Sequence, residues 1–180
     1  GPDVFRPDAM AHAKRKIEIC RRYGIEGLAP LNQDVAPPAE PAAARWQTVF
    51  DKDVAMMEAC DCIIANLTPF GGASADAGTL IEVGWFLGRG KPIFAYSNTR
   101  ASFEERMRRQ LALAADDADC TMAIEGFHLP DNLMIVGAVM GSGYPIIVPN
   151  ETGARDSAAL DVFEACVANA AAAMAVATRP

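Results

Sequence analysis

The sequence predicts an α/β fold: a flavodoxin- or Rossmann-like, doubly wound parallel sheet of about five strands with helices on both faces. Short apolar runs alternate with stretches of helical periodicity along the 180 residues, an order typical of parallel sheets wrapped by helices. Residues 61–67 form a nearly continuous apolar run, as expected of a strand buried on both faces. A loop rich in glycine and serine follows, which predicts a ligand site beyond the carboxyl ends of the strands.

Before residue 60, the pattern predicts two helices, one strand and one long loop. Residues 8–23 carry apolar side chains at helical spacing and end before Gly24. Residues 25–31 are predicted as a short strand. Residues 35–44 contain three prolines, which oppose regular structure, so we expect a surface loop of the kind that often acts as a lid. Residues 45–59 predict the second helix.

After residue 60, predicted strands and helices alternate. The strand at residues 61–67 leads through the loop at residues 69–78 into a helix. Residues 101–115 predict a helix with a solvated face, because basic and acidic positions alternate there (Glu104, Glu105, Arg106, Arg108 and Arg109). The other predictions are helices at 79–89, 130–141 and 156–178, strands at 92–96 and 146–148, and an irregular segment at 116–127.

Charge and length exclude several classes of protein. The chain has 16 Lys and Arg against 23 Asp and Glu, a net charge of −7 and a pI near 4.8. Proteins that bind polymeric nucleic acid or an anionic membrane need a basic face, so neither partner is expected. The length suits a single domain over residues 1–180. We therefore expect a site for a small molecule.

The cysteines and the apolar runs bear on the compartment. The five cysteines form neither a disulfide framework nor a pattern with zinc spacing, so no metal site is predicted. A reducing cytoplasm is the expected setting. No apolar run approaches the roughly 20 residues of a membrane helix, so no membrane span is expected.

The most informative stretch runs from Ala65 to Trp85. Its glycines let the backbone approach a ligand closely, and it carries carboxylates at Asp76 and Glu82. Near the positive end of a helix Glu82 would stay ionised, which suits a nucleophile or a stabiliser of an oxocarbenium ion. Two structural interpretations stay open. Thr79 and Glu82 fit a capping box, and Asp76 fits a helix N-cap.

Four motifs, taken in order, resemble the nucleoside 2-deoxyribosyltransferase family. They are the opening Gly1-Pro-Asp-Val-Phe-Arg-Pro-Asp-Ala9, Asp53 with Asp61, the stretch 65–85, and Pro130-Asp-Asn-Leu-Met134. The resemblance runs from residue 1 to about residue 140. In the family a strand leads directly into the first motif, so a first strand is expected before Gly1. The loop Phe70-Gly-Gly-Ala73 lacks the Arg and Pro of closer relatives, which leaves the base preference open.

The resemblance implies a role for each matching residue. Glu82 is the nucleophile that attacks C1′ of the deoxyribose and holds it as a covalent glycosyl-enzyme. Asp76 and Asp53 are the acidic residues that exchange a proton with the base. The implied substrate-binding residues are Phe5, which packs on the base, Gln33, which positions it, Gly78, and Asn132 and Met134, which a neighbouring subunit of a homo-oligomer supplies.

This set of residues suits the cleavage of an N-glycosidic bond. Positive charge develops on the sugar as the bond breaks, and an ionised Glu82 can stabilise and then trap it, as in retaining glycoside hydrolysis. Three clustered carboxylates cannot all be ionised comfortably, so at least one is expected to have a raised pKa and act as the acid. The expected substrates are a deoxynucleoside and a free nucleobase, with no cofactor and no metal.

Three rival functions stay open. A hydrolase of the same superfamily would let water take the sugar from a nucleoside or its 5′-monophosphate. Residues 72–82 approach the Gly-Gly-x-Gly-Thr-x-x-Glu motif of phosphoribohydrolases, but Ser74-Ala-Asp76 breaks its spacing. A non-catalytic nucleotide-binding sensor would bind its ligand without turnover.

Overall fold

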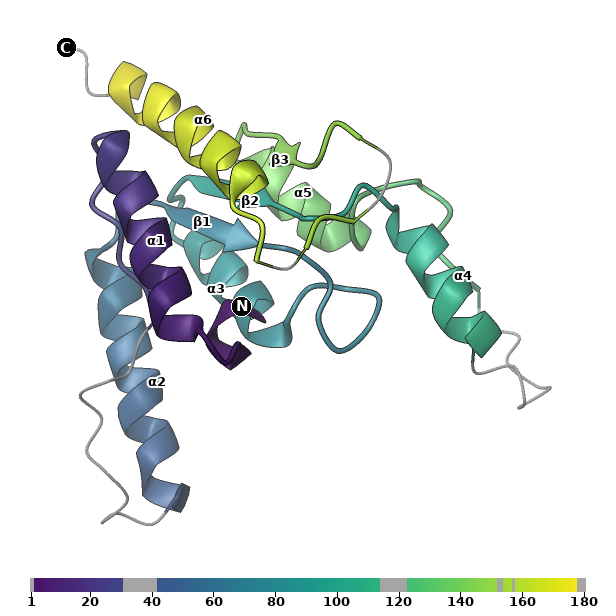
Figure 1. Cartoon of the computed structure of the whole chain (residues 1–180), viewed down its shortest axis with the longest axis horizontal. Coiled ribbons are helices and arrows are strands. Elements are labelled where there is room, and N and C mark those ends of the chain that lie inside the picture. Colours follow the sequence, from purple (N-terminus) through teal and green to yellow (C-terminus); the bar gives the residue numbers. More distant parts are fainter. Residues whose placement is uncertain (1, 31–41, 114–122, 152–153, 157, 178–180) are drawn as a thin grey trace. The chain divides into compact units, whose positions relative to one another are not determined.

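The computed structural model describes residues 2–30, 42–113, 123–151, 154–156 and 158–177 (Figure 1). Its elements follow the order η1, α1, α2, β1, α3, β2, α4, α5, β3 and α6. The chain divides into two compact units, Asp3–Asp61 and Cys62–Pro180, the second of which includes Gly1–Pro2. Among the described helices, none combines the length and the apolarity that crossing a bilayer takes.

The unit Cys62–Pro180 is built on a parallel sheet. Its strands lie in the order β1 (Ile63–Asn66), β2 (Ile93–Tyr96) and β3 (Ile146–Ile147). All four side chains of β2 are buried, which explains why its sequence shows no alternation of polar and apolar residues. The predicted parallel sheet is confirmed.

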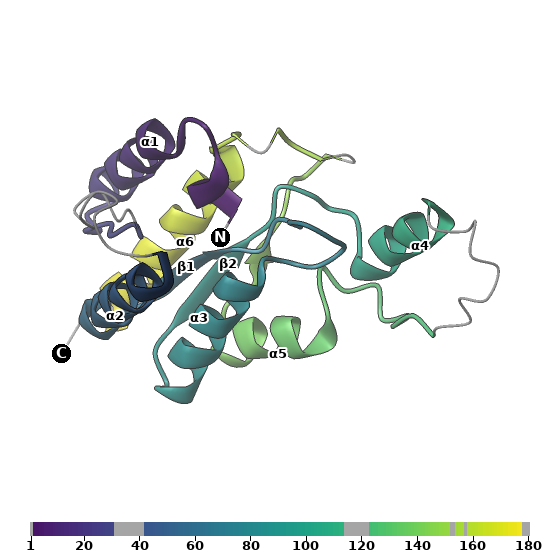
Figure 2. The same ribbon diagram turned by 90° about the horizontal axis from the view of Figure 1, so that it is seen from below.

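Helices cover both faces of this sheet (Figure 2). α3 (Ala77–Gly88) and α5 (Leu133–Gly141) contact each other and lie on one face, whereas α6 (Asp161–Ala177) contacts all three strands on the other. Phe163 of α6 is buried, with its ring centroid 5.5 Å from that of Tyr96. Burial of such a side chain contributes about 1.5–3 kcal/mol, so contacts of this kind hold the layers together. The predicted doubly wound arrangement is confirmed.

α4 (Phe103–Leu113) lies in the segment 103–129, whose two ends are hydrogen-bonded to each other. A capping box starts the helix: the Ser102 N–H donates to Glu105 Oε2 at 2.7 Å, and the Glu105 N–H donates to Ser102 Oγ at 3.2 Å. The Phe103 N–H donates to the Leu129 carbonyl at 2.8 Å, which joins the two ends of segment 103–129. The helix predicted over residues 101–115 is confirmed over Phe103–Leu113, and residues 114 and 115 lie outside the described residues.

The sheet has three strands in the described part of the chain, fewer than the five predicted. The strand predicted at residues 25–31 is wrong over residues 25–30, which form no regular element. Residue 31 lies outside the described residues.

The C-terminus of α1 (Ala9–Arg22) explains the missing strand. The helix ends in a Schellman motif, in which the Gly24 N–H donates to the Arg21 carbonyl and the Ile25 N–H donates to the Cys20 carbonyl. Gly24 has a φ of 76°, as this motif requires. A Cβ at Gly27 would lie only 3.1 Å from Cys20 Cβ, so the chain runs back close to the helix. Ile25 therefore completes the cap of α1 instead of starting a strand.

In the unit Asp3–Asp61, the regular elements of the described residues are all helices. This unit contains α1, α2 (Ala42–Ala59) and most of a 3-10 helix, η1 (Pro2–Phe5). Both long helices are predicted by the sequence, and the opening segment forms one 3-10 turn. Residues 31–41, which include most of the predicted lid, lie outside the described residues.

α1 buries a histidine, His12. His12 is 1% exposed, with Nε2 at 3.3 Å from Asp3 Oδ1 and Nδ1 at 3.4 Å from Arg15 Nη2. Because a guanidinium only donates, this geometry assigns Nδ1 as the acceptor and the proton to Nε2 of a neutral ring. Burial lowers the pKa of His12 by more than Asp3 raises it.

We expect the protein to lose stability as the pH falls below the ordinary histidine pKa of 6.5. The pKa of His12 is lowered in the folded state, so the unfolded chain binds the proton first. The stabilisation is complete above this pH and is lost on the way down to the folded pKa. Thermal unfolding near pH 7.5 and pH 5.5 measures the loss. His12→Gln should reduce it, whereas His128→Gln, at a side chain 81% exposed, should not. Equal pH dependence in wild type and His12→Gln would contradict this assignment.

Candidate active site

The loops after β1 and β2 are joined at the carboxyl end of the sheet. Asn66, the last residue of β1, accepts a hydrogen bond at Oδ1 from the Thr68 N–H at 3.0 Å, which turns the chain out of the strand. Thr68 Oγ1 accepts from the Asn98 N–H, which follows β2, at 3.0 Å. These residues therefore hold together the edge at which α/β sheets bind ligands.

The glycine-rich segment after Thr68 forms a tight turn. The Phe70 N–H donates to the Ser74 carbonyl at 3.1 Å, and Gly71 has a φ of 69°, a left-handed conformation that costs glycine least. The turn leads directly to Asp76, at the start of α3.

Asp76 is the N-cap of α3, as one of the two structural interpretations predicts. Its Oδ2 accepts from the Thr79 N–H at 3.1 Å and lies 3.4 Å from Thr79 Oγ1. Thr79 is buried inside the first turn, so the other interpretation, a capping box of Thr79 with Glu82, is wrong. Glu82 lies half-buried in the second turn, where the effect of the helix N-terminus on a carboxylate has decayed. The helix dipole therefore does not provide the expected support for an ionised Glu82.

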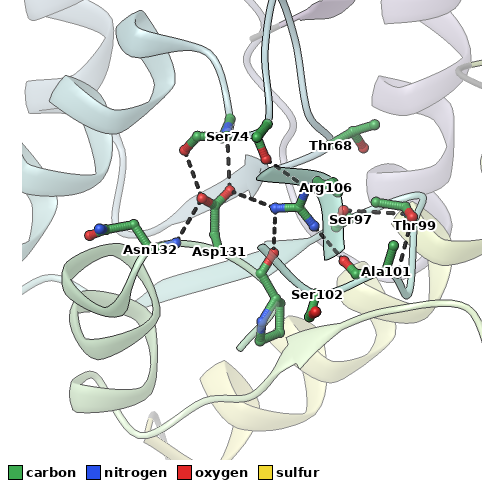
Figure 3. Close-up of polar contacts among 12 residues, drawn as sticks. Thr68, Ser74, Ser97, Thr99, Ala101, Ser102, Arg106, Asp131 and Asn132 are labelled. Atoms are coloured by element: carbon green, nitrogen blue, oxygen red, sulfur yellow. Dashed lines mark hydrogen bonds and ion pairs between the residues drawn. The ribbon is translucent and has the colours of Figure 1, made fainter. Parts of the chain in front are cut away.

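A buried ion pair, Asp131 with Arg106, ties the turn to α4 and α5 (Figure 3). Asp131 is 1% exposed, and its Oδ2 lies 3.6 Å from Arg106 Nη2. Oδ1 accepts from Ser74 Oγ at 2.6 Å and from the Asn132 N–H at 2.8 Å, and Oδ2 accepts from the Ala75 N–H at 3.0 Å. The carboxylate thus has the cation and the hydrogen bonds that a buried charge requires.

Main-chain carbonyls satisfy the guanidinium of Arg106. Nε donates to the Ala73 carbonyl at 2.6 Å, Nη2 to the Pro130 carbonyl at 2.8 Å, and Nη1 to the Ala101 carbonyl. The side chain is 10% exposed, and burial lowers the pKa of Arg106 whereas Asp131 raises it. One side chain therefore holds three separate segments of the chain.

Asn132 and Met134 lie at the start of α5. Asn132 is the N-cap, because its Oδ1 accepts from the Met134 N–H at 3.0 Å, and its Nδ2 donates to Glu125. The Met134 side chain is 73% exposed. The structure thus fixes the Asn132 amide and leaves Met134 at the surface of this unit.

The two units divide the predicted site residues. Asp53 is half-buried on α2 and Phe5 is exposed in η1, both in the unit Asp3–Asp61. Gln33 lies outside the described residues. The other predicted residues lie on two helices of the unit Cys62–Pro180 that contact each other, α3 (Asp76, Gly78 and Glu82) and α5 (Asn132 and Met134).

Asp131 and Arg106 are candidates that the sequence analysis misses. Asp131 belongs to the motif at residues 130–134, but the resemblance assigns roles to other residues of that motif. The predicted solvated face of α4 is wrong for Arg106 and correct for Arg108, which is exposed and pairs with Glu104 at 2.8 Å. Neither member of the buried pair produces a periodic signal, because the partners lie far apart in sequence.

The residues of this site lie within the part of the chain that matches a known protein family. The sequence model described as nucleoside 2-deoxyribosyltransferase matches residues 1–134. The chain belongs to the nucleoside 2-deoxyribosyltransferase family. The matched residues include the turn, α3, the Asp131–Arg106 pair and the start of α5. The predicted family is therefore confirmed.

Two relatives of this chain extend the comparison. A solved structure of a 2-deoxyribosyltransferase from Leishmania mexicana is 27% identical with a TM-score of 0.59, over 96% of this chain and 93% of that one. An uncharacterized protein from Schizosaccharomyces pombe is 32% identical over 120 residues, 66% of this chain. The match spans 57% of the length of that relative.

Gly78→Ala is expected to lower the base-exchange activity proposed below about tenfold or more, because a Cβ at Gly78 would lie 3.1 Å from Asp76 Oδ2 and displace that carboxylate. Initial rates of base exchange measure the effect. Gly84→Ala is the control on the same helix, since its Cβ would meet no atom within 4 Å. It should keep full activity and raise the melting temperature through helix propensity. Wild-type rates in Gly78→Ala would contradict the crowding argument.

Proposed function

We propose that this protein transfers the 2-deoxyribosyl group between nucleobases through a covalent intermediate on Glu82. One observation carries the proposal. In a chain of this family, Glu82 is a half-buried carboxylate in the second turn of α3, and this helix follows the turn at the carboxyl edge of the sheet. Such a carboxylate suits a nucleophile. We assign residues 1–180 to a single working domain.

The proposed reaction has two displacement steps. A carboxylate oxygen of Glu82 bonds to C1′ as the C1′–N bond breaks, and the departing base takes a proton from the carboxylic acid of Asp76 or Asp53. In the second step another base attacks C1′, its proton passes to that carboxylate, and the Glu82–C1′ bond breaks. Glu82 stabilises the positive charge on the sugar in both steps, as in retaining glycoside hydrolysis. General acid help contributes typically ~10²–10⁴-fold, and no cofactor takes part.

The substrate-binding roles follow the family pattern. Phe5, an exposed ring, would pack on the base, and Gln33 would position it. Gly78 leaves room beside the Asp76 carboxylate, and Asn132 and Met134 of a neighbouring subunit would close the sugar pocket. Base exchange of this kind would serve nucleotide salvage in the cytoplasm.

The contacts of Arg106 favour a nucleoside over its 5′-monophosphate. A bound phosphate needs cationic side chains or N–H groups that can donate to it. Arg106 is a cation that contacts the turn, and its Nε, Nη1 and Nη2 each donate to a main-chain carbonyl. The Ala75 N–H of the turn donates to Asp131. These donors are engaged within the protein, which supports an unphosphorylated substrate.

Incubation with deoxyinosine and adenine tests the proposed function. Transfer yields deoxyadenosine together with hypoxanthine, which chromatography separates. Hypoxanthine without deoxyadenosine would indicate the hydrolase, and tight binding without any product would indicate the sensor. Deoxyinosine 5′-monophosphate is the matched substrate control and should be the poorer donor.

We also propose that the working enzyme is a homo-oligomer. Ile81 on α3 is 70% exposed. On α5, Met140 is 58% exposed and Met134 is 73% exposed. Large exposed apolar side chains on two adjoining helices are typical of a contact surface. This surface contains Met134, which the family pattern assigns to a neighbour's pocket. An isolated subunit would therefore lack a complete pocket.

Met134→Glu is expected to dissociate the oligomer and to lower transfer about 10²-fold, because it would bury an unpaired carboxylate and misplace the pocket. Light scattering after size-exclusion chromatography reports the mass, and initial rates report the activity. Val176→Glu, at an equally exposed position on α6, is the control and should change neither. A fully active wild-type monomer at high dilution would contradict the proposal.

A further inference from the structure

We propose that Asp131, together with Arg106, positions two parts of the active site at once: the turn that precedes Asp76 and the N-terminus of α5 that begins with Asn132. This inference rests on the proposed function. Both members of the pair are positioning residues, because they act through the backbone that they hold.

The first part is the turn between β1 and α3. Ser74 Oγ and the Ala75 N–H donate to the two oxygens of Asp131, at 2.6 Å and 3.0 Å. Ala75 directly precedes Asp76, so these bonds set the point at which the capping carboxylate and the helix begin. The preceding glycines give the turn little stiffness of its own. Asp131 supplies the constraint that this sequence lacks.

The second part is the start of α5. The Asp131 oxygen that accepts from Ser74 also accepts from the Asn132 N–H, at 2.8 Å. Asn132 in turn caps the helix by accepting from the Met134 N–H at 3.0 Å. One oxygen atom therefore joins the turn to the helix that carries Asn132 and Met134. A displacement of this atom would move both.

Arg106 holds the same two segments from the residues just before them. Its Nε donates to the carbonyl of Ala73, which precedes Ser74, and its Nη2 donates to the carbonyl of Pro130, which precedes Asp131. The guanidinium is planar, so it fixes the relative direction of these bonds as well as their lengths. In an assembly where α5 closes a neighbour's pocket, the pair thereby connects the turn of one pocket to the closing residues of the next.

Two variants and one control test this coupling. Ser74→Ala removes a single hydrogen bond from Asp131 and keeps the ion pair, so the chain should fold, and Asp131→Asn is the stronger variant. Ser142→Ala is the matched control, because the Ser142 hydroxyl is also a hydrogen-bond donor inside the fold, with the carbonyls of Val139 at 2.7 Å and Ile93 at 3.0 Å as its acceptors, at the other end of α5. The measurements are kcat and KM of base exchange, and amide hydrogen exchange of peptides that cover residues 73–76 and 132–134.

We expect kcat to fall about tenfold in Ser74→Ala and about 10²-fold in Asp131→Asn, with a smaller change in KM, since misplacement by about 1 Å can cost about 10²-fold. Ser74→Thr, which restores the hydroxyl, should restore kcat. Amide exchange should accelerate in both segments in both variants. In Ser142→Ala, kcat and the exchange of both segments should match the wild type.

Faster exchange in only one of the two segments would overturn the proposal, and so would wild-type kcat in both variants. Should Asp131→Asn fail to fold, Ser74→Ala decides by the same criteria. A wild-type protein that exchanges no base, while its variants accelerate amide exchange in both segments, would refute the proposed function and support the coupling.

Discussion

Glu82→Ala is expected to abolish deoxyribosyl transfer, with a loss in kcat/KM of about 10⁴- to 10⁶-fold, the range in which removal of a member of a covalent catalytic set falls. Without the carboxylate, no protein atom bonds to C1′ between the two half-reactions. The fold should persist, because Asp76 and not Glu82 caps α3. Initial rates with deoxyinosine and adenine measure the loss.

A matched control and a trapped intermediate sharpen this test. Glu151→Ala removes an exposed carboxylate that pairs with Arg155 at 3.3 Å, and it should leave the rate unchanged. A 2-fluoroarabinosyl nucleoside slows the second step, so the wild-type protein should gain the mass of the sugar, and peptide mapping should place it on Glu82. A label on another residue, or substantial transfer by Glu82→Ala, would exclude Glu82 as the nucleophile.

Asp131→Ala is expected to lower the free energy of unfolding by about 3–5 kcal/mol, because it leaves the guanidinium of Arg106 buried without its carboxylate. It also leaves the Ala75 N–H without its acceptor. Unfolding in urea measures the change. The size of this effect depends on burial, since the side chains of Asp131 and Arg106 are 1% and 10% exposed.

The control for this prediction is an ion pair at the surface. Asp161 is 56% exposed and lies 3.2 Å from Arg155, so Asp161→Ala should cost less than about 1 kcal/mol. Adding Arg106→Met to Asp131→Ala should restore part of the lost stability, because the unpaired charge is then removed. Equal losses for Asp131→Ala and Asp161→Ala would show that the buried pair does not contribute as described.

The elements that the sequence predicts well are those whose pattern is decided locally. β2 is an unbroken apolar run, and α1 and α2 repeat apolar residues at helical spacing. The segment at residues 25–31 has a similar apolar character, yet Ile25 closes the Schellman motif of α1. A propensity for strand does not reveal that a preceding helix uses the same residue as its cap.

Helix caps show a second limit of prediction from sequence. Ser102 with Glu105 and Thr79 with Glu82 have the same spacing, and only the first pair forms a capping box. At α3 the preceding loop ends at Asp76, which occupies the N-cap position. Thr79 therefore lies inside the first turn of the helix. Spacing alone cannot choose between overlapping caps, because the choice depends on where the preceding loop ends.

The candidate site was predictable to the extent that it lies on one continuous stretch. Asp76, Gly78 and Glu82 share a loop and a helix, so their residue types and spacing could be interpreted together. Arg106 lies on α4 and Asp131 lies beyond that helix, just before α5, and only the fold brings them together. A buried pair of this kind looks in the sequence like two ordinary charges.

The hydrogen bond between Phe103 and Leu129 bears on how this chain could change over evolutionary time. Because this hydrogen bond joins the two ends of the segment 103–129, the length of the segment can vary without shifting the strands. A loop that doubles in length costs only about 0.6 kcal/mol in closure entropy. Insertions and deletions after the first turns of α4, which carry Arg106, would leave the ion pair of Arg106 with Asp131 in place. Descendants of the chain could therefore gain an additional structural element in this segment and keep the same active site.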